Sequence, residues 1–323
     1  MKKSSVLVTG CAGFIGSNFV AAFEKRFPDF PIIGIDDFST GRREALSPHI
    51  TFYEGSICDE RLVGKIFRKH KPKYVFHFAA LPRVSYSVEF PAKTTLVNVY
   101  GTVLLLEHSR DYNVKRFIYS SSSSVYGGAK RMPTKEKENP PNPVSPYALE
   151  KYAGEPFCRI FSGLYGLDTV SLRYFNVFGP GQYGDSSYST VISAWLEGTY
   201  FPKKRKIFLE GDGRQSRDFC FVGNVVDANI QAMRFHGKFS GEVFNIAEGQ
   251  RTSLLAVKKA IEQMTNRKLY LEKHPPRKGD VRHTHADISK AREWFGYNPK
   301  FDFKTGLGKT VEWYMLRAVE NAH

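Results

Sequence analysis

The chain has 323 residues, of which 41% are hydrophobic and 24% are charged. This composition is typical of a soluble globular protein with about two domains, and no apolar run approaches the ~18 residues of a membrane span. The glycine-rich start does not resemble a signal peptide, so we expect a cytoplasmic protein without membrane insertion. Its four cysteines, Cys11, Cys58, Cys158 and Cys220, are widely separated, which predicts reduced thiols.

The formal net charge is +15, which permits a nucleic acid, an anionic membrane or a nucleotide as partner. The densest basic run, residues 203–206, follows Phe201 and Pro202 and is typical of an exposed loop. We find no stacking aromatic residues or nucleic-acid motif around it, so we predict no nucleic-acid partner.

The first expected strand leads directly into a glycine-rich turn. Val6 to Val8 form an apolar run, and Gly10, Gly13 and Gly16 follow at a spacing of three before a helical apolar pattern. A strand that turns tightly into a helix presents free N–H groups and the positive end of the helix dipole to a ligand. The turn therefore predicts a pyrophosphate site, although its spacing differs from the commoner GxGxxG.

An acidic residue ends the second expected strand, residues 31–35. Asp36 lies twenty residues after Gly16, where a carboxylate can accept both ribose hydroxyls of an adenosine and repel a 2′-phosphate. No arginine follows it directly, and Arg42 and Arg43 lie further along the loop. Asp36 and the absence of an arginine directly after it predict NAD rather than NADP as the cofactor.

Strands and helices alternate through the first half of the chain, with further strands expected near residues 50–53, 74–78, 117–119 and 169–173. This order predicts an α/β fold, a Rossmann-type doubly wound parallel sheet. We assign residues 1–175 to this domain, with a returning strand near 241–246, and residues 176–323 to a smaller α/β lobe. Leu307, Val311 and Tyr314 predict a final amphipathic helix.

Several residues fall where the expected parallel strands end, the edge at which such sheets bind ligands. Ser56 and Ile57 could flank an adenine, and Ala79 and Ala80 leave room for a cofactor. His77, among apolar neighbours, is expected to be a satisfied core histidine. Asn98, near the start of a helix expected over residues 92–111, could reach a ribose or lie on the surface. The serine run 120–124 should place hydroxyls at the cleft.

A Tyr-x-x-x-Lys pair follows in the next expected helix, for which Ser145 and Pro146 provide a start signal. Tyr147 and Lys151 are four residues apart and project from one helical face. A tyrosine has a pKa of ~10, and a nearby ammonium and a positive cofactor ring would favour its phenolate, as a general base requires. Pro156 should kink this helix.

Taken together, the motifs resemble those of the extended short-chain dehydrogenase/reductases, and most closely the nucleotide-sugar 4-epimerases that act on UDP-hexoses. The resemblance covers essentially the whole chain, in the segments TGCAGFIG, HFAA, SSSSVYG, SPYALEK, RYFNVFGP, GDGRQSRDF and RKGD. It implies a tightly held NAD, a transient 4-keto sugar and a homodimer built on the helices near 92–111 and 146–165.

The resemblance also implies roles for individual residues. Tyr147 would be the base, Lys151 its electrostatic partner and Ser122 the assisting hydroxyl. The cofactor would contact Gly10, Gly13, Phe14, Ile15, Gly16, Asp36, Asp37, Phe38, Ser39, Gly41, Ser56, Ile57, Phe78, Ala79, Ala80, Asn98, Ser120, Tyr147, Lys151 and Tyr174. The UDP-sugar would contact Ser122, Ser123, Ser124, Tyr147, Asn176, Val191, Phe208, Arg217, Arg277, Asp280 and Thr284.

Differences within this superfamily narrow the expected reaction. Nucleotide-sugar 4,6-dehydratases carry Thr-Asp-Glu where this chain has Ser122 to Ser124, so we do not expect water elimination. Ser123 and Thr284 occupy positions that, in related epimerases, help to decide whether a 2-N-acetyl group fits. Both are small here, which resembles the epimerases of UDP-N-acetylglucosamine. His283 and His285 have no further ligands in sequence, so we predict no metal site.

Two alternatives remain open. One is a UDP-glucuronate epimerase or decarboxylase of the same family. The other is a non-catalytic module that binds NAD or RNA.

Overall fold

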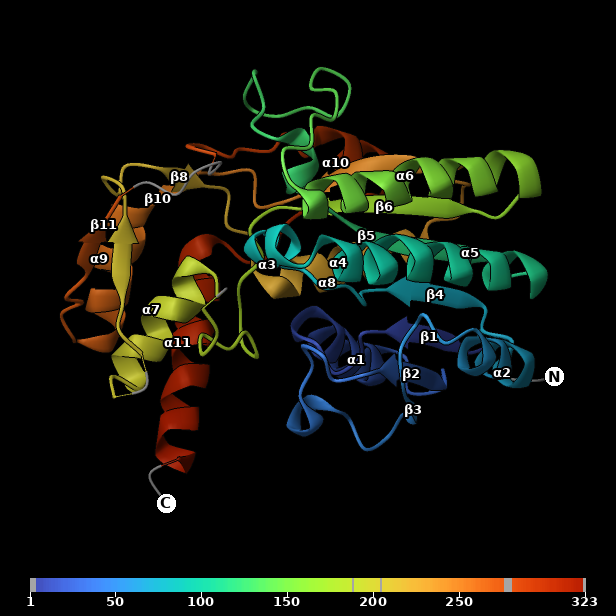
Figure 1. Cartoon of the computed structure of the whole chain (residues 1–323), viewed down its shortest axis with the longest axis horizontal. Coiled ribbons are helices and arrows are strands. Elements are labelled where there is room, and N and C mark those ends of the chain that lie inside the picture. The colour runs from blue at the N-terminus through green and yellow to red at the C-terminus, as the bar shows by residue number, and fades with distance from the viewer. Residues whose placement is uncertain (1–3, 188, 204, 276–280, 322–323) are drawn as a thin grey trace.

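In a computed structural model, which describes residues 4–187, 189–203, 205–275 and 281–321, a parallel sheet organises the chain (Figure 1). Its seven strands run in the order β3-β2-β1-β4-β5-β6-β9. The strands are β1 (Val6–Thr9), β2 (Ile32–Asp36), β3 (Thr51–Glu54), β4 (Tyr74–His77), β5 (Arg116–Ser122), β6 (Thr169–Tyr174) and β9 (Glu242–Ile246). The predicted doubly wound Rossmann-type sheet is confirmed.

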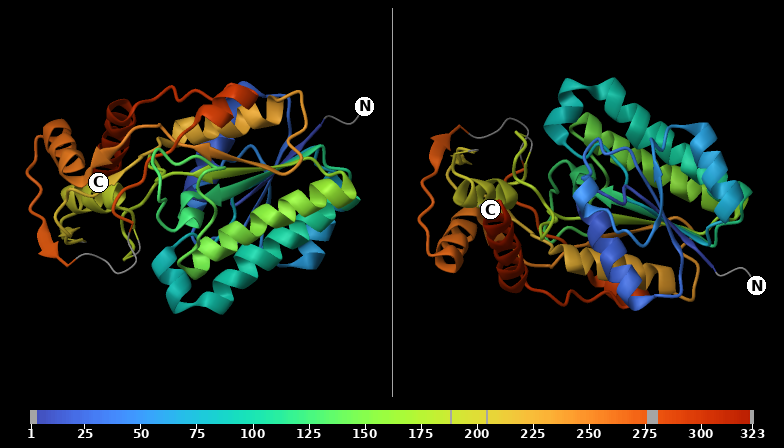
Figure 2. Two further views of the ribbon diagram at one scale, coloured as in Figure 1. Left: turned by 90° about the horizontal axis from the view of Figure 1, so that it is seen from above. Right: turned by 90° about the horizontal axis from the view of Figure 1, so that it is seen from below.

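Helices cover both faces of this sheet (Figure 2). On one face, α1 (Phe14–Arg26) packs beside α8 (Val222–Arg234), and both contribute side chains to one core cluster. The opposite face carries α2 (Glu60–His70), α5 (Gly101–Asp111) and α6 (Pro146–Tyr165) around a second cluster. Burial on both faces explains why β1 contains the continuous apolar run Val6 to Val8.

The helix expected over residues 92–111 consists of three joined segments. It begins as α4 (Pro91–Thr95), passes through a π-helical turn, η2 (Leu96–Tyr100), and continues as α5. A short helix, α3 (Val84–Glu89), precedes it. Pro156 does not interrupt α6, which continues to Tyr165; the nitrogen of proline cannot donate, so one backbone bond is missing there.

A smaller lobe lies beyond the carboxyl edge of the sheet (Figures 1 and 2). It contains α7 (Val191–Tyr200), α9 (Leu254–Thr265) and α11 (Phe303–Glu320), which share a third core cluster. Two small sheets complete it: β7 (Phe208–Glu210) pairs in parallel with β11 (Glu272–His274), and β8 (Ser216–Arg217) pairs antiparallel with β10 (Thr252–Ser253). Leu307, Val311 and Tyr314 are buried on α11, as predicted.

The second half of the chain contributes more elements to the large sheet layer than the single returning strand expected from the sequence. The returning strand is confirmed, since β9 pairs in parallel with β6. In addition, α8 packs on α1, and α10 (Ser289–Phe295) packs against β9. Segments from the second half of the chain therefore complete the first layer.

The cysteines and the helices bear on the predicted reduced thiols and the predicted lack of a membrane span. None of the four cysteines, all of which lie in the described part of the chain, is in a disulfide. No helix within the described residues is long and apolar enough to cross a membrane.

Candidate active site

A cavity of about 790 Å³ lies at the carboxyl edge of the sheet, between the two lobes. Segments that follow β1, β2, β4, β5 and β6 meet there because the parallel strands end at one edge. The predicted site residues that line it are Gly10, Gly13, Phe14, Ile15, Gly16, Asp36, Asp37, Ser39, Ile57, Phe78, Ala79, Ala80, Ser122, Ser123, Ser124, Tyr147, Tyr174, Asn176, Arg217 and Thr284.

The glycine turn brings backbone close to the cavity, as its sequence predicted. Gly10 has φ +68°, and a Cβ on Gly16 would lie 2.0 Å from the carbonyl oxygen of Gly10. Gly13 is the N-cap of α1, with no side-chain cap and no acidic residue in the first turn. The first helical N–H groups are thus left for a ligand, and this geometry fits the pyrophosphate of NAD.

Asp36 lines the same cavity at the end of β2. Its Oδ2 accepts a hydrogen bond from the N–H of Ala12 at 2.9 Å, and its Oδ1 accepts one from Phe38 at 2.8 Å. Two carboxylate oxygens offer about four acceptor sites, so capacity remains for ribose hydroxyls. Burial raises the pKa of Asp36, and these backbone bonds oppose the shift.

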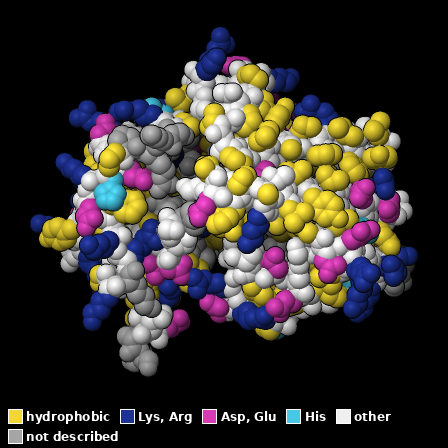
Figure 3. Space-filling view, viewed as in Figure 1, with side chains coloured by type: hydrophobic (Ala, Val, Ile, Leu, Met, Phe, Trp, Pro, Cys, Tyr) yellow, Lys and Arg dark blue, Asp and Glu magenta, His cyan; other side chains and the backbone are white. Residues whose placement is uncertain are grey.

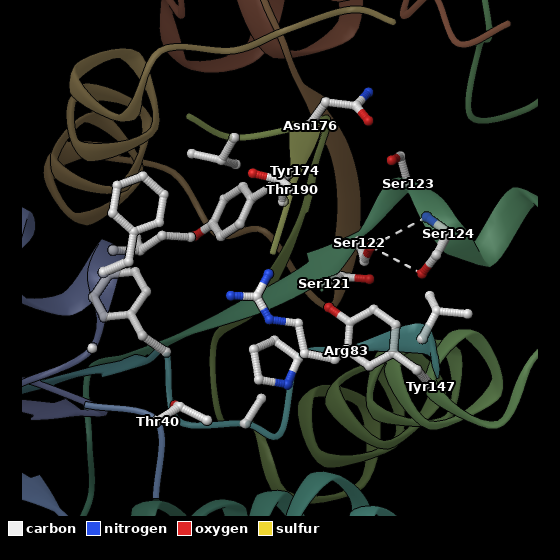
Figure 4. Close-up of a pocket in the computed structure, with 18 of the residues that line it drawn as sticks. Thr40, Arg83, Ser121, Ser122, Ser123, Ser124, Tyr147, Tyr174, Asn176 and Thr190 are labelled. Carbon is white, nitrogen blue, oxygen red and sulfur yellow. Dashed lines mark hydrogen bonds between the residues drawn. The ribbon is translucent and has the colours of Figure 1, made fainter. Parts of the chain in front are cut away.

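Tyr147 lies in the first turn of α6 and points its hydroxyl into the cavity toward the end of β5 (Figure 4). Ser145 caps this helix by accepting a hydrogen bond from Ala148 at 3.2 Å, and Ser87 accepts one from the N–H of Tyr147 at 3.0 Å. These contacts fix where the helix begins. The position of the phenol is consequently determined by backbone geometry.

The hydroxyl of Ser122, at the end of β5, is a hydrogen-bond partner of the phenol. It accepts hydrogen bonds from the N–H and the hydroxyl of Ser124, at 3.2 and 2.9 Å (Figure 4). Hydrogen bonding to Ser122 also lowers the pKa of Tyr147. The predicted pair of Tyr147 and Ser122 is thereby brought together in one cavity.

The expected effect of the Lys151 ammonium on the pKa of Tyr147 stays a prediction. Burial raises the pKa of Tyr147 above its ordinary value; Ser122 and the guanidinium of Arg83 oppose this shift, and Glu150 adds to it. Lys151 is 4% exposed, and its ammonium donates to the carbonyl of Ser120 at 2.8 Å. Burial lowers the pKa of Lys151 to about 8.

Residues of the second half of the chain form the opposite wall. Asn176 donates to the hydroxyl of Thr284 at 2.9 Å, and that hydroxyl also accepts from the N–H of Asp218. A second cavity of about 230 Å³ adjoins this wall and shares Asn176 and Arg217 with the first. The predicted Val191 and Phe208 line this second cavity.

Six predicted residues among those described line neither cavity: Phe38, Gly41, Ser56, Asn98, Ser120 and Lys151. Phe38 and Gly41 nevertheless lie against Asp36. Ser120 bonds through its hydroxyl to that of Tyr174 at 3.2 Å. Arg277 and Asp280 lie outside the described residues.

Asn98 neither lines the cavity, as a ribose contact would require, nor lies on the surface. It is 2% exposed, and its amide oxygen accepts from the N–H of Leu81 at 2.8 Å. Its amide nitrogen donates to Glu150 at 2.7 Å and to the carbonyl of Leu81 at 3.2 Å. These contacts support the loop after β4 from behind, so a direct ribose contact stays a prediction without support from this geometry.

Three histidines near the site form hydrogen bonds to other residues of the protein. His77 bonds through Nδ1 to the hydroxyl of Thr9 at 2.8 Å and through Nε2 to that of Thr102 at 2.9 Å, which confirms a satisfied core histidine. His283 lines the cavity and bonds to Ser216, whereas His285 bonds to the carbonyl of Gly249. Among the described residues, no cluster of three metal-ligating side chains occurs.

The structure also adds a residue that the sequence reasoning missed. Arg83 follows β4 immediately before α3, and its guanidinium points into the cavity near the hydroxyl of Tyr147 (Figure 4). The only sequence signal was its place a few residues after HFAA, in a loop at the carboxyl edge. Gln182 and Thr190 from the loop before α7 were missed as well.

Comparisons with known proteins agree with this geometry. Residues 6–247 match the model of the NAD dependent epimerase/dehydratase family. A UDP-glucose 4-epimerase of Mycolicibacterium smegmatis is 38% identical over 95% of this chain and 97% of its own length.

Solved structures are similar over the whole chain. A UDP-glucose 4-epimerase of Thermotoga maritima with UDP-glucose has a TM-score of 0.91 and 39% identity, over 97% of this chain and 99% of that one. A UDP-N-acetylglucosamine 4-epimerase of Methanobrevibacter ruminantium, in complex with UDP-N-acetylmuramic acid, has a TM-score of 0.89 and 35% identity, over 98% and 100%. The chain thus belongs to the NAD dependent epimerase/dehydratase family.

Proposed function

We propose that this protein is an NAD-dependent 4-epimerase of a UDP-hexose. The observation that carries the proposal is the position of Tyr147. Its hydroxyl shares one cavity with Ser122, with the open N-terminus of α1 and with Asn176 and Arg217 of the opposite wall. A dinucleotide and a nucleotide sugar can therefore meet at a single phenol.

The cofactor would be held mainly by residues 1–175 and the UDP-sugar mainly by residues 176–323. Gly13 and the first turn of α1 would bind the NAD pyrophosphate, and Asp36 the adenosine ribose. When bound, NAD supplies the acceptor and donor of hydride for the sugar carbon. Arg217 would bind the UDP phosphates, because a guanidinium forms paired, charge-assisted bonds to phosphate oxygens.

The chain's own residues would manage the proton of the reacting hydroxyl. Tyr147 would take it from the sugar O4, and Ser122 would share it through its hydrogen bond. With the C4 hydride given up as well, the sugar would carry a ketone at C4; C4 would then recover hydride on its other face, and O4 would recover the proton from Tyr147. Substrate and product have the same oxidation state, so turnover needs no added reductant.

A substrate panel tests this function. The full-length protein is incubated with NAD and UDP-glucose, UDP-N-acetylglucosamine or UDP-glucuronic acid, and the 4-epimers are separated. We expect one of these sugars to reach a mixture of epimers, and Tyr147→Phe to lower kcat by about 10²- to 10⁴-fold. Tyr270, which is 82% exposed, provides the matched control Tyr270→Phe. No epimer from any of the three sugars would exclude the proposal.

We also propose a homodimer through the outer face of η2 and α6. Leu96 and Tyr100 on η2 and Leu149, Ile160 and Leu164 on α6 are between 45% and 72% exposed. Hydrophobic side chains gather over this region (Figure 3). A contiguous apolar surface of this kind is typical of an interface, and a second copy would bury it symmetrically.

We place the protein in the cytoplasm. Support comes from the four unpaired thiols, three of which are buried in the core, because reducing compartments favour such cysteines.

A further inference from the structure

We propose that Arg83 selects a sugar that carries a carboxylate next to the reacting carbon, so that the substrate is a UDP-hexuronic acid. This inference rests on the proposed function and narrows its substrate class. It depends on the surroundings of one guanidinium.

Among the residues that the structure describes, Arg83 has no hydrogen-bond or ion-pair partner, although it lies at the cavity wall. The nearest carboxylate that acts on its pKa, Asp185, is already paired with Arg42. Burial lowers the pKa of Arg83 from its ordinary value, which reports the cost of removing this cation from water.

A partly desolvated cation without a partner is costly, and proteins rarely keep one unless a ligand supplies the opposite charge. The guanidinium offers five donors in a planar fork, which matches the two oxygens of a carboxylate. An anionic group of the ligand is therefore the chemistry that Arg83 best fits.

The position of Arg83 indicates which part of the ligand bears that charge. The α1 N-terminus and Arg217 provide separate places for the NAD and UDP phosphates. Arg83 faces the space beside Tyr147, where the C4 hydroxyl must lie for its proton to be removed (Figure 4). Carbon 5 of a hexuronic acid is the neighbour of C4 and carries the C6 carboxylate, which brings the charge within reach of Arg83.

Apart from Arg217, which is assigned to the UDP phosphates, and His283, the other described polar side chains that line this cavity carry no positive charge. Ser122, Ser123 and Ser124 carry only hydroxyls, and Asn176 and Thr284 bond to each other. Lys151 is behind the wall and bonded to Ser120. The discrimination between a carboxylate and a hydroxymethyl group would therefore depend on Arg83.

The test compares UDP-glucuronic acid with UDP-glucose, which differ only in having COO⁻ or CH₂OH at C5. We expect the full-length protein to favour the glucuronate in kcat/KM, and Arg83→Met to lower that value about 30-fold while changing UDP-glucose by less than threefold. Arg83→Lys should retain part of the preference, since it keeps the charge and loses the fork. Arg234→Met, at the exposed end of α8, is the matched control.

Calorimetric binding of UDP, NAD and both sugars distinguishes the sources of the anion. Equal losses for both sugars in Arg83→Met, with weaker binding of UDP or NAD, would assign Arg83 to a phosphate and overturn the proposal. A preference for a neutral sugar that Arg83→Met leaves unchanged would also overturn it, yet leave the epimerase function intact. Failure of all UDP-sugars in the panel would instead exclude the proposed function.

Discussion

The ammonium of Lys151 donates a hydrogen bond of 2.8 Å to the backbone carbonyl of Ser120, one turn of α6 away from the phenol of Tyr147. Lys151 thus ties α6 to the end of β5, while Arg83 is the cation whose charge reaches Tyr147 from the cavity side. The bond between Lys151 and Ser120 holds α6 against β5, and the charge of Arg83 favours the ionised form of Tyr147.

The lowered pKa of Lys151 predicts that its contribution to the free energy of unfolding depends on pH. Its pKa is about 8 in the folded protein against 10.5 ordinarily, so the unfolded chain binds more protons between these values. Stability conferred by this residue should therefore rise as pH increases from 8 to 10.5 and should be lowest below pH 8. Relative to Lys151→Met, the wild type should gain up to about 3 kcal/mol across this window.

Urea unfolding of both proteins at several pH values measures this difference. A constant difference between pH 7 and 10 would contradict the assigned shift. Lys151→Met should also lower turnover at pH 7, because the variant lacks the charge and the bond to Ser120.

Asp36 should set the cofactor preference. In Asp36→Asn, we expect NAD affinity to fall about tenfold and discrimination against NADP to weaken, since an amide neither repels a 2′-phosphate nor accepts both hydroxyls. Calorimetric titration with each dinucleotide measures both effects. Asp29→Asn, on an exposed residue after α1, should leave them unchanged. Retained selectivity in Asp36→Asn would remove this role.

A buried ion pair behind the cavity should be important for stability. Glu155 accepts two hydrogen bonds from Arg173, at 2.8 and 2.6 Å, and one from Ser121, at 2.5 Å; both charged side chains are at most 5% exposed. Glu155→Gln leaves the guanidinium without its counter-charge, which we expect to destabilise the fold by about 3 kcal/mol.

The matched control is Glu138→Gln, because Glu138 forms an exposed pair with Lys135 that should contribute at most about 1 kcal/mol. Denaturant unfolding compares the two variants. Similar losses in both would show that the buried pair is no more important than the exposed one.

The proposed dimer predicts that a charge on its face dissociates the protein. Leu164 on α6 is 72% exposed, and Leu164→Glu should yield monomers without a loss of helical content, because a carboxylate resists burial. Analytical ultracentrifugation measures the mass. Leu316→Glu, on a residue of α11 that is 54% exposed, should leave the dimer intact. A monomeric wild type would reject the interface.

Local patterns in the sequence determined much of the fold. The passage from β1 through the glycine turn into α1, the acid at the end of β2 and the Tyr147–Lys151 spacing all depend on neighbours within a few residues. Strand and helix periodicity arise from the backbone itself, so the sheet, its returning strand β9 and the helix of Tyr147 could be predicted.

Only the tertiary structure decided where individual side chains point. Asn98 does not line the cavity because its amide is hydrogen-bonded to Leu81 and Glu150. The ammonium of Lys151 donates to Ser120. Arg83 has no distinctive motif, yet the loop after β4 brings it to Tyr147, 64 positions further along the chain. Such encounters depend on strand order and packing between distant segments, which local spacing does not encode.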